Sequence, residues 1–168
     1  GSVQDILKIA PNVKVLCHEI EIPYLQGELP PVKTTALKQI FANMPAEKRA
    51  YFDSFADAVK NTKFKIDESL TDGQVFPFGE FGLEIIHTPG HTLGHICLYI
   101  KESKILLVSD IIVIEDGNVV VPILTADIPA ATKSLEKLLP YDTEQVVFYH
   151  GGLYQGDIRS EIKKLLAG

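Results

Sequence analysis

The sequence predicts an α/β protein in which helices cover sheets, and two observations support this prediction. From residue 64 onward, short apolar runs rich in β-branched residues alternate with turn residues, as expected of strands. Helical patterns cluster before residue 62 and return between and after the later strands. Interleaved strands and helices are typical of layered α/β folds. The 168 residues suffice for one domain with a core and show no internal repeat, so a single domain over 1–168 is expected.

The amino-terminal part is expected to be mainly helical. Its expected elements are, in order, a helix over 3–10, a strand over 13–17, and two amphipathic helices over 35–43 and 46–61. Pro45 separates the two long helices and suits the first turn of the second, because proline lacks the N–H that a helix interior needs.

The remaining residues are expected to form strands with two covering helices. Strands are predicted over 64–66, 83–86, 96–100, 105–108, 111–114, 119–121 and 145–149. Asp116-Gly117 is a tight-turn signal between two of these strands. Helices are predicted over about 128–139 and 157–166, and Asp127 is expected to cap the first of them.

Charge and cysteine content exclude some classes of protein. A formal charge of −6 argues against nucleic-acid binding, which needs a basic patch, and Lys163-Lys164 is interpreted as a solvated helix face. No apolar stretch approaches the roughly 20 residues that cross a bilayer, so no membrane partner is expected.

Cys17 and Cys97 could form a disulfide, but without a visible secretory signal we interpret them as buried free thiols of a cytoplasmic protein. The chain does not begin with Met, so a preceding segment could still carry such a signal.

Three of the five histidines lie within one nine-residue run, His87-Thr88-Pro89-Gly90-His91-Thr92-Leu93-Gly94-His95. Imidazole is a common zinc ligand, and a loop at strand ends can direct several side chains at one point. The glycines would allow close backbone approach and unusual dihedral angles. The run could equally be a turn whose histidines are hydrogen-bonded, and the spacing alone does not decide between these interpretations.

Two further polar residues end apolar strands. Asp110 follows the run 106–109, where a carboxylate is costly to bury unless it is paired or binds a metal; the alternative is a helix or turn cap. His150 follows the run 146–149 and precedes two glycines. Ligands on rigid strand ends that converge at one sheet edge are a common way to build a metal site. His91, Asp110 and His150 are therefore the candidate ligands.

Together these motifs resemble the metallo-β-lactamase superfamily, which includes glyoxalase II and lactonases. The family's Thr-Pro-Gly-His-Thr-x-Gly-His loop is matched at 88–95, which makes His91 a metal ligand. A family strand that ends in Asp supplies a carboxylate bridging two metals; Asp110 is similar, although the family usually has Gly where Ser109 stands. A late strand that ends in His-Gly supplies the last ligand, which corresponds to His150.

The resemblance covers nearly the whole chain from Val13 and implies an αββα sandwich, with residues 31–62 as a helical insertion. The family's His-x-His-x-Asp-His signature does not occur in the sequence. The chain therefore resembles the carboxy-terminal part of the fold, with the amino-terminal strands missing. Gly1-Ser2 could continue the signature segment or could be a cloning remnant.

The resemblance also implies two divalent metal ions in the complete protein, commonly zinc and sometimes iron or manganese. His91 would hold one ion, His150 the other, and Asp110 would bridge them and could steer the attacking water or accept a proton, which makes it the expected catalytic residue. The family position of His95 lies near the metal without binding it, so a supporting hydrogen bond is its expected task. His87 is expected to orient the loop.

The implied activity is metal-dependent hydrolysis of a small thioester, lactone or similar carbonyl compound. The alternative is a non-catalytic fragment that pairs an exposed sheet edge with another copy or with the missing segment. A nucleic-acid-processing role is disfavoured by the acidic charge. The 168-residue chain by itself is expected to be inactive. His18 is interpreted as structural, and Tyr149 and Tyr154 as packing residues that could line a substrate pocket.

Overall fold

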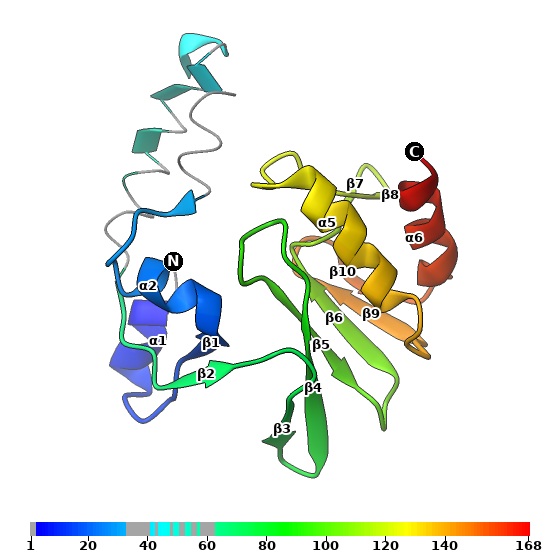
Figure 1. Cartoon of the computed structure of the whole chain (residues 1–168), viewed down its shortest axis with the longest axis horizontal. Helices are drawn as coiled ribbons and strands as arrows, with labels where there is room; N and C mark the ends of the chain where they lie inside the picture. The colour runs from blue at the N-terminus through cyan, green and yellow to red at the C-terminus, as the bar shows by residue number, and fades with distance from the viewer. Residues whose placement is uncertain are drawn as a thin grey trace. The chain divides into compact units, whose positions relative to one another are not determined.

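The computed structural model describes residues 3–32, 41–42, 44–47, 49–50, 53–54, 57 and 63–168 (Figure 1). The chain divides into two compact units, Gly1–Ser69 and Leu70–Gly168, and each is described by itself. The helices predicted over 35–43 and 46–61 lie largely outside the described residues. A single domain over 1–168, with a helical insertion at 31–62, stays a prediction.

The described residues of the first unit form short helices and a pair of strands. Its elements are α1 (Val3–Ile9), β1 (Leu16–His18), the 3-10 helix η1 (Glu19–Glu21), α2 (Ile22–Leu25) and β2 (Glu68–Leu70), and β1 pairs with β2. The predicted strand over 13–17 therefore begins only at residue 16, and the one predicted over 64–66 is displaced to β2. His18 is buried, and its Nδ1 accepts the backbone N–H of Ile20 over 3.4 Å, which is a capping contact for η1.

A six-stranded sheet is the centre of the second unit (Figure 1). Its strands are β3 (Val75–Phe78), β4 (Phe81–His87), β5 (Ile96–Ile100), β6 (Ile105–Ser109), β9 (Gln145–Phe148) and β10 (Gly152–Tyr154). The spatial order is β10-β9-β6-β5-β4-β3, and within it β6 and β9 are parallel while the other neighbours are antiparallel. Parallel strands need a crossover connection, which here contains β7 (Val113–Glu115), β8 (Asn118–Val120), α5 (Ile128–Leu135) and the 3-10 helix η2 (Glu136–Leu138).

Helices α5 and α6 (Ile158–Ala167) pack on one face of this sheet. Alternate strand residues and the inner faces of both helices form one buried apolar cluster, which includes Ile86, Cys97, Leu106, Val108, Val146, Phe148, Ala131, Leu135, Leu138, Ile158 and Ile162. Asp127 Oδ1 accepts the N–H of Ala130 over 2.9 Å at the start of α5, so the predicted cap is confirmed. Asp157 caps α6 in the same way through the N–H of Ser160.

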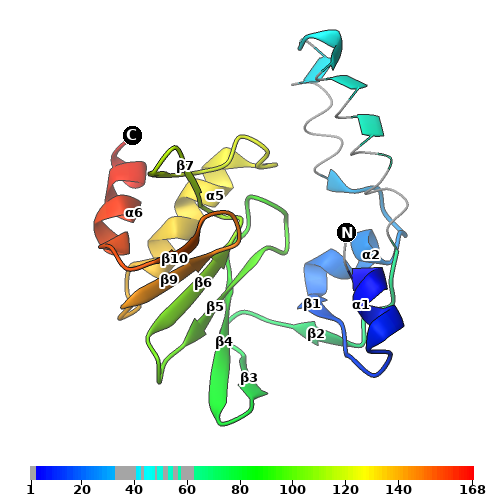
Figure 2. The ribbon, with the colours of Figure 1, turned by 180° about the vertical axis from the view of Figure 1, so that it is seen from behind.

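The opposite face of the sheet is also apolar. Ile85, Leu98, Leu107 and Val147 are paired in register across four neighbouring strands, and Leu153 continues the row on β10. No helix of residues 70–168 lies on this face (Figure 2). A face that only contacts water would carry polar residues at these positions. The aliphatic row is therefore suited to packing against another apolar layer.

The sequence did not predict the edge strands β3 and β10, and it placed β7 two residues too early. Ile111 and Ile112 are fully buried in the bend that precedes β7, so their apolar character reflects burial and not strand structure. Both cysteines are buried and free, as predicted. Within the described part of the chain, no helix combines the length and the apolar character that crossing a membrane requires.

Candidate metal centre

The three residues predicted as metal ligands lie together at one end of the six-stranded sheet. His91 belongs to the β4–β5 loop, Asp110 directly follows β6, and His150 follows β9 after one residue. Oδ2 of Asp110 lies 3.8 Å from Nε2 of His91, and Oδ1 of Asp110 lies 3.6 Å from Nε2 of His150. The carboxylate thus stands between the two imidazoles. Across the described ranges, no group of three or more His, Cys, Asp or Glu side chains is arranged to hold one ion.

The surroundings of Asp110 fit a divalent cation. Its Oδ1 is buried and has no hydrogen-bond partner among the described residues. A buried carboxylate oxygen without a donor is costly, and a metal ion is one way to satisfy it. Zinc ligands at about 2.0–2.2 Å lie roughly 3–3.5 Å from one another, and the two N–O separations of 3.6 and 3.8 Å are close to that range. Imidazole and carboxylate donors suit zinc, iron and manganese alike.

The loop that carries His91 is fixed against the start of α5. Gly90 has a φ of +144°, and a Cβ at this position would lie 2.4 Å from the Cα of Ala131. The N–H of Asp127 donates to the carbonyl of Gly90 over 3.0 Å, and the hydroxyl of Ser134 donates to the carbonyl of Pro89 over 2.7 Å. Only glycine permits this close approach, which explains the residue before His91.

The ring of His91 is 8 % exposed and is held from one side. Its Nδ1 lies 3.4 Å from the hydroxyl of Thr125, while its Nε2 is the atom nearest Asp110. A hydrogen bond at one ring nitrogen orients the other toward a metal. Sequence reasoning missed Thr125, because it lies 34 residues from His91 in a loop without a recognisable motif.

Asp110 follows a residue in an unusual conformation. Ser109 has a φ of +49°, in the left-handed region that favours glycine, and the β6–β9 register shifts between Leu107 and Ser109. This conformation gives a physical reason for the glycine that the family usually has there. The backbone N–H of Asp110 then donates to Nε2 of His95 over 3.2 Å. That ring nitrogen therefore faces the main chain of Asp110, as a supporting role for His95 requires.

His150 is held by its backbone, since its side chain is 68 % exposed. Its carbonyl accepts the N–H of Ile114 over 3.0 Å, and the ring of Tyr149 packs edge-on at 5.1 Å. Gly151 has a φ of +140°, and a Cβ there would lie 2.8 Å from the Cβ of Ile114. The glycine after His150 thus allows the chain to pass β7 closely.

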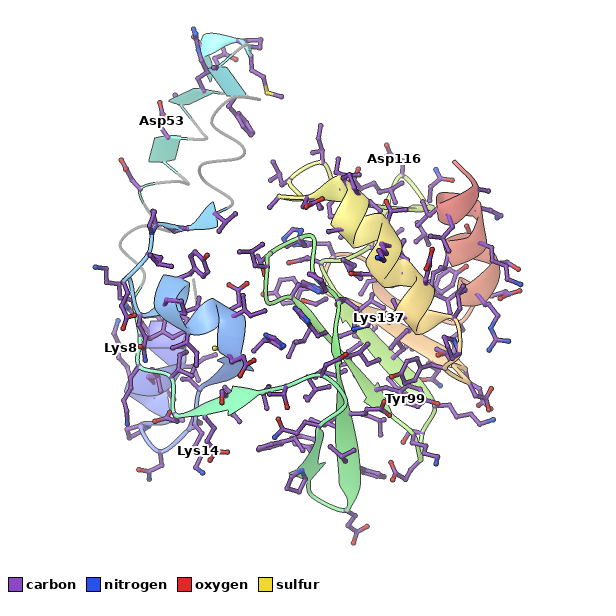
Figure 3. All side chains as sticks on the ribbon, viewed as in Figure 1. Lys8, Lys14, Asp53, Tyr99, Asp116 and Lys137 are labelled. Atoms are coloured by element: carbon purple, nitrogen blue, oxygen red, sulfur yellow. The ribbon has the colours of Figure 1, made fainter. Side chains whose placement is uncertain are left out.

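His87 is anchored by three hydrogen bonds. Its Nε2 bonds the carbonyl of Leu93 over 2.9 Å, its N–H donates to Asp72 over 2.7 Å, and its carbonyl accepts from Lys137 over 2.6 Å. Lys137, which belongs to η2 and is labelled in Figure 3, also forms an ion pair with Asp72 at 2.9 Å. Partial burial would raise the pKa of Asp72, but the bonds from Lys137 and His87 outweigh it and lower that pKa. These contacts hold the start of the loop.

An apolar cavity of about 240 Å³ lies on the face away from the helices. Its lining residues come from β5, β6, β9 and the residue after β9, and they are Ile96, Leu98, Leu107, Ser109, Val147 and Tyr149. Tyr149 thus lines a cavity beside the residue that precedes Asp110. Tyr154 instead packs edge-on against Phe148 at 5.9 Å and belongs to the core, as expected of a packing residue.

Comparison with known proteins identifies similar chains. A hydroxyacylglutathione hydrolase of Rhizobium etli is 42% identical over 45 residues, 27% of this chain and 18% of the relative. The human acyl-coenzyme A thioesterase MBLAC2 is 43% identical over 51 residues, 30% of this chain and 18% of that enzyme. The matched stretches thus span less than a fifth of these relatives.

Solved structures share the fold over almost the whole chain. A metallo-beta-lactamase family protein of Thermus thermophilus, TTHA1429, has a TM-score of 0.66 at 22% identity over 95% of this chain and 53% of its own. TTHA1623, solved in a di-iron-bound form, has a TM-score of 0.58 at 22% identity over 92% of this chain and 65% of its own. The chain therefore spans about half to two thirds of these neighbours. The family profile of the metallo-beta-lactamase superfamily matches residues 1–150, so the chain belongs to this superfamily and forms part of its layered α/β sandwich.

Proposed function

We propose that this chain contributes to a metal-dependent hydrolase, and one observation carries the proposal. The carboxylate of Asp110 stands between Nε2 of His91 and Nε2 of His150, with one buried oxygen that lacks a hydrogen-bond donor among the described residues. Asp110 and His150 follow the ends of β6 and β9, and His91 lies in the loop between β4 and β5, so the rigid sheet keeps these donors in place. A purely structural role would leave the buried oxygen unsatisfied.

Each residue has a distinct role in this proposal. His91 would hold one divalent ion, His150 would hold the other, and Asp110 would bridge them through its two oxygens. Zinc is favoured, and iron or manganese would suit the same donors. Such ions, when bound, supply an acidic water and stabilise negative charge that develops on a carbonyl oxygen. Asp110 is placed to orient that water and to accept its proton.

The substrate is proposed to be a thioester, a lactone or a similar carbonyl compound. The similar proteins include a hydroxyacylglutathione hydrolase and an acyl-coenzyme A thioesterase, which favours an acyl thioester. Two buried free thiols favour a cytoplasmic location, where cysteines stay reduced. The acidic net charge disfavours nucleic acid as a partner.

Self-association through a sheet edge is proposed at β10. The other edge strand, β3, contains Pro77, which cannot donate a hydrogen bond and therefore blunts that edge. Sedimentation velocity over a range of concentrations tests this. A chain that stays monomeric throughout would contradict the edge pairing.

The test of the proposed function compares two proteins. One is this chain, and the other is the chain extended at its amino end by a family segment with the His-x-His-x-Asp-His signature. Both are incubated with zinc, iron or manganese, and acyl-thioester and lactone hydrolysis is measured. Metal-dependent turnover by the extended protein, lost on Asp110→Ala, is expected. An extended protein that folds and binds metal but hydrolyses neither class would reject the proposal.

A further inference from the structure

A buried chain of hydrogen bonds runs beneath Asp110. His95 Nε2 accepts the backbone N–H of Asp110 over 3.2 Å, and its Nδ1 lies 2.8 Å from the hydroxyl oxygen of Thr88. That hydroxyl lies 3.4 Å from Sγ of Cys97, whose thiol donates to the carbonyl of Val108 over 3.6 Å. Thr88 and Cys97 are fully buried and His95 is 8 % exposed.

The donor and the acceptor of each of these hydrogen bonds can be assigned from the groups at the two ends of the run. A backbone N–H can only donate, so Nε2 of His95 must accept, and the proton of the neutral ring lies on Nδ1. Nδ1–H then donates to Thr88, which leaves the threonine proton for Cys97. Burial raises the pKa of Cys97 to about 12, so its thiol keeps the proton that it donates to Val108.

The two ends of this run of hydrogen bonds lie on either side of Ser109, the residue with the left-handed backbone conformation. Val108 precedes Ser109 and Asp110 follows it, and the β6–β9 register shifts at this point. A shift of register removes backbone groups from regular strand pairing, and buried groups of this kind need other partners. His95 and Cys97, which Thr88 connects, supply these partners on both sides of Ser109.

We propose that Thr88 is a positioning residue, which fixes His95 in its Nδ1–H tautomer and through it holds the backbone of Asp110. The importance of Thr88 for activity rests on the proposed metal site at Asp110. The tautomer of His95 and its contact with the Asp110 backbone do not depend on that metal site. Mutation of residues that hydrogen-bond a metal ligand commonly lowers metal affinity by roughly 10–100-fold. We expect a loss of the same size when the Thr88 hydroxyl is removed.

The tautomer can be measured without metal or substrate. Side-chain ¹⁵N spectra of the metal-free chain should show His95 protonated at Nδ1. Thr88→Val removes the acceptor and should change that signature and shift the Asp110 amide resonance, whereas Thr88→Ser should preserve both. Thr143→Val is the matched control, because the Thr143 hydroxyl bonds the carbonyl of Tyr141, far along the sequence from the loop.

A zinc titration of the same variants supplies the second measurement. Zinc affinity should fall about 10–100-fold in Thr88→Val and stay near that of the parent chain in Thr88→Ser and Thr143→Val. If His95 of the parent chain is protonated at Nε2, the proposal is wrong. This measurement needs no variant, so it tests the proposal even if Thr88→Val misfolds. Equal zinc affinity in Thr88→Val and the parent would also overturn it. A lack of hydrolysis would count against the proposed function alone.

Discussion

Nε2 of His150 lies 3.6 Å from Oδ1 of Asp110, although the two residues are 40 positions apart in the sequence. The contact follows from topology. Asp110 comes after β6 and His150 after β9, and these neighbouring strands are parallel. Neighbouring parallel strands have their carboxyl ends at the same end of the sheet, so the residues that follow these two strands lie close together. The crossover through α5 therefore creates the site as well as part of the core.

In the protein extended by the signature segment, replacing Asp110 with Ala should remove most hydrolytic activity and weaken metal binding. One carboxylate is proposed to serve both ions, so zinc bound per chain at a fixed free concentration should fall at least about tenfold. His87→Ala should lower zinc binding much less, because Nε2 of His87 bonds the carbonyl of Leu93. Elemental analysis after dialysis measures both. Equal, small losses in the two variants would show that the ligand assignment is wrong.

The metal-free form provides a control on that result. Removing a buried oxygen that has no hydrogen-bond partner among the described residues should not destabilise the fold. The free energy of unfolding of metal-free Asp110→Ala should therefore equal or slightly exceed that of the parent. A large loss of stability would indicate that the metal effect results from misfolding.

Gly90 should not tolerate a larger residue. A Cβ would lie 2.4 Å from the Cα of Ala131, and the φ of +144° is itself strained for other residues. Gly90→Val should cost more than about 3 kcal/mol of stability and reduce zinc binding, because backbone must move to relieve the clash. Gly117→Ala is the control, since its φ is +79° but nothing lies within 4 Å of the added Cβ. A loss of stability no larger than that of the control would refute the packing argument. Gly94 is expected to show the same intolerance of β-branched residues.

Ser109→Gly should stabilise the chain. A left-handed conformation costs non-glycine residues about 1–2 kcal/mol, and the extra entropy of glycine in the unfolded chain offsets part of this gain. A net increase of up to about 1 kcal/mol is therefore expected in chemical denaturation. Ser103→Gly, in the exposed turn before β6, should be neutral or destabilising. Destabilisation by Ser109→Gly would mean that the serine side chain contributes more than the strain costs.

The stability of the loop anchor should depend on pH through Asp72. Its pKa is lowered in the folded state, so its contribution is complete above the unfolded pKa of about 3.9 and is lost as pH falls through the lower folded value. Asp72→Asn should therefore be destabilising at pH 7, and the difference from the parent should shrink below about pH 4. Urea denaturation at several pH values measures this. A difference that stays constant down to pH 2 would contradict the role of the Asp72 charge.

The sequence predicted the parts of the site that depend on local pattern. Asp110 and His150 were found because each follows an apolar run, and His91 was found in a nine-residue loop with three histidines and two glycines. Contacts between distant segments were not predictable in this way. Thr125 lies beside His91 only because the crossover returns there, and Lys137 reaches His87 from another element. The short strand β10 was missed because glycines hide its strand pattern.

The final prediction is that the 168-residue chain alone does not catalyse hydrolysis. Catalytic zinc sites commonly use three protein ligands for each ion. Here one ion would have His91 and Asp110, and the other would have Asp110 and His150. Two ligands hold an ion loosely, and water activation needs a firmly held ion, so turnover should be abolished and not merely slowed.

The measurement is thioester and lactone hydrolysis by the purified chain with added zinc, iron or manganese, beside the extended protein as positive control. Clear metal-dependent turnover by the chain alone would contradict the prediction.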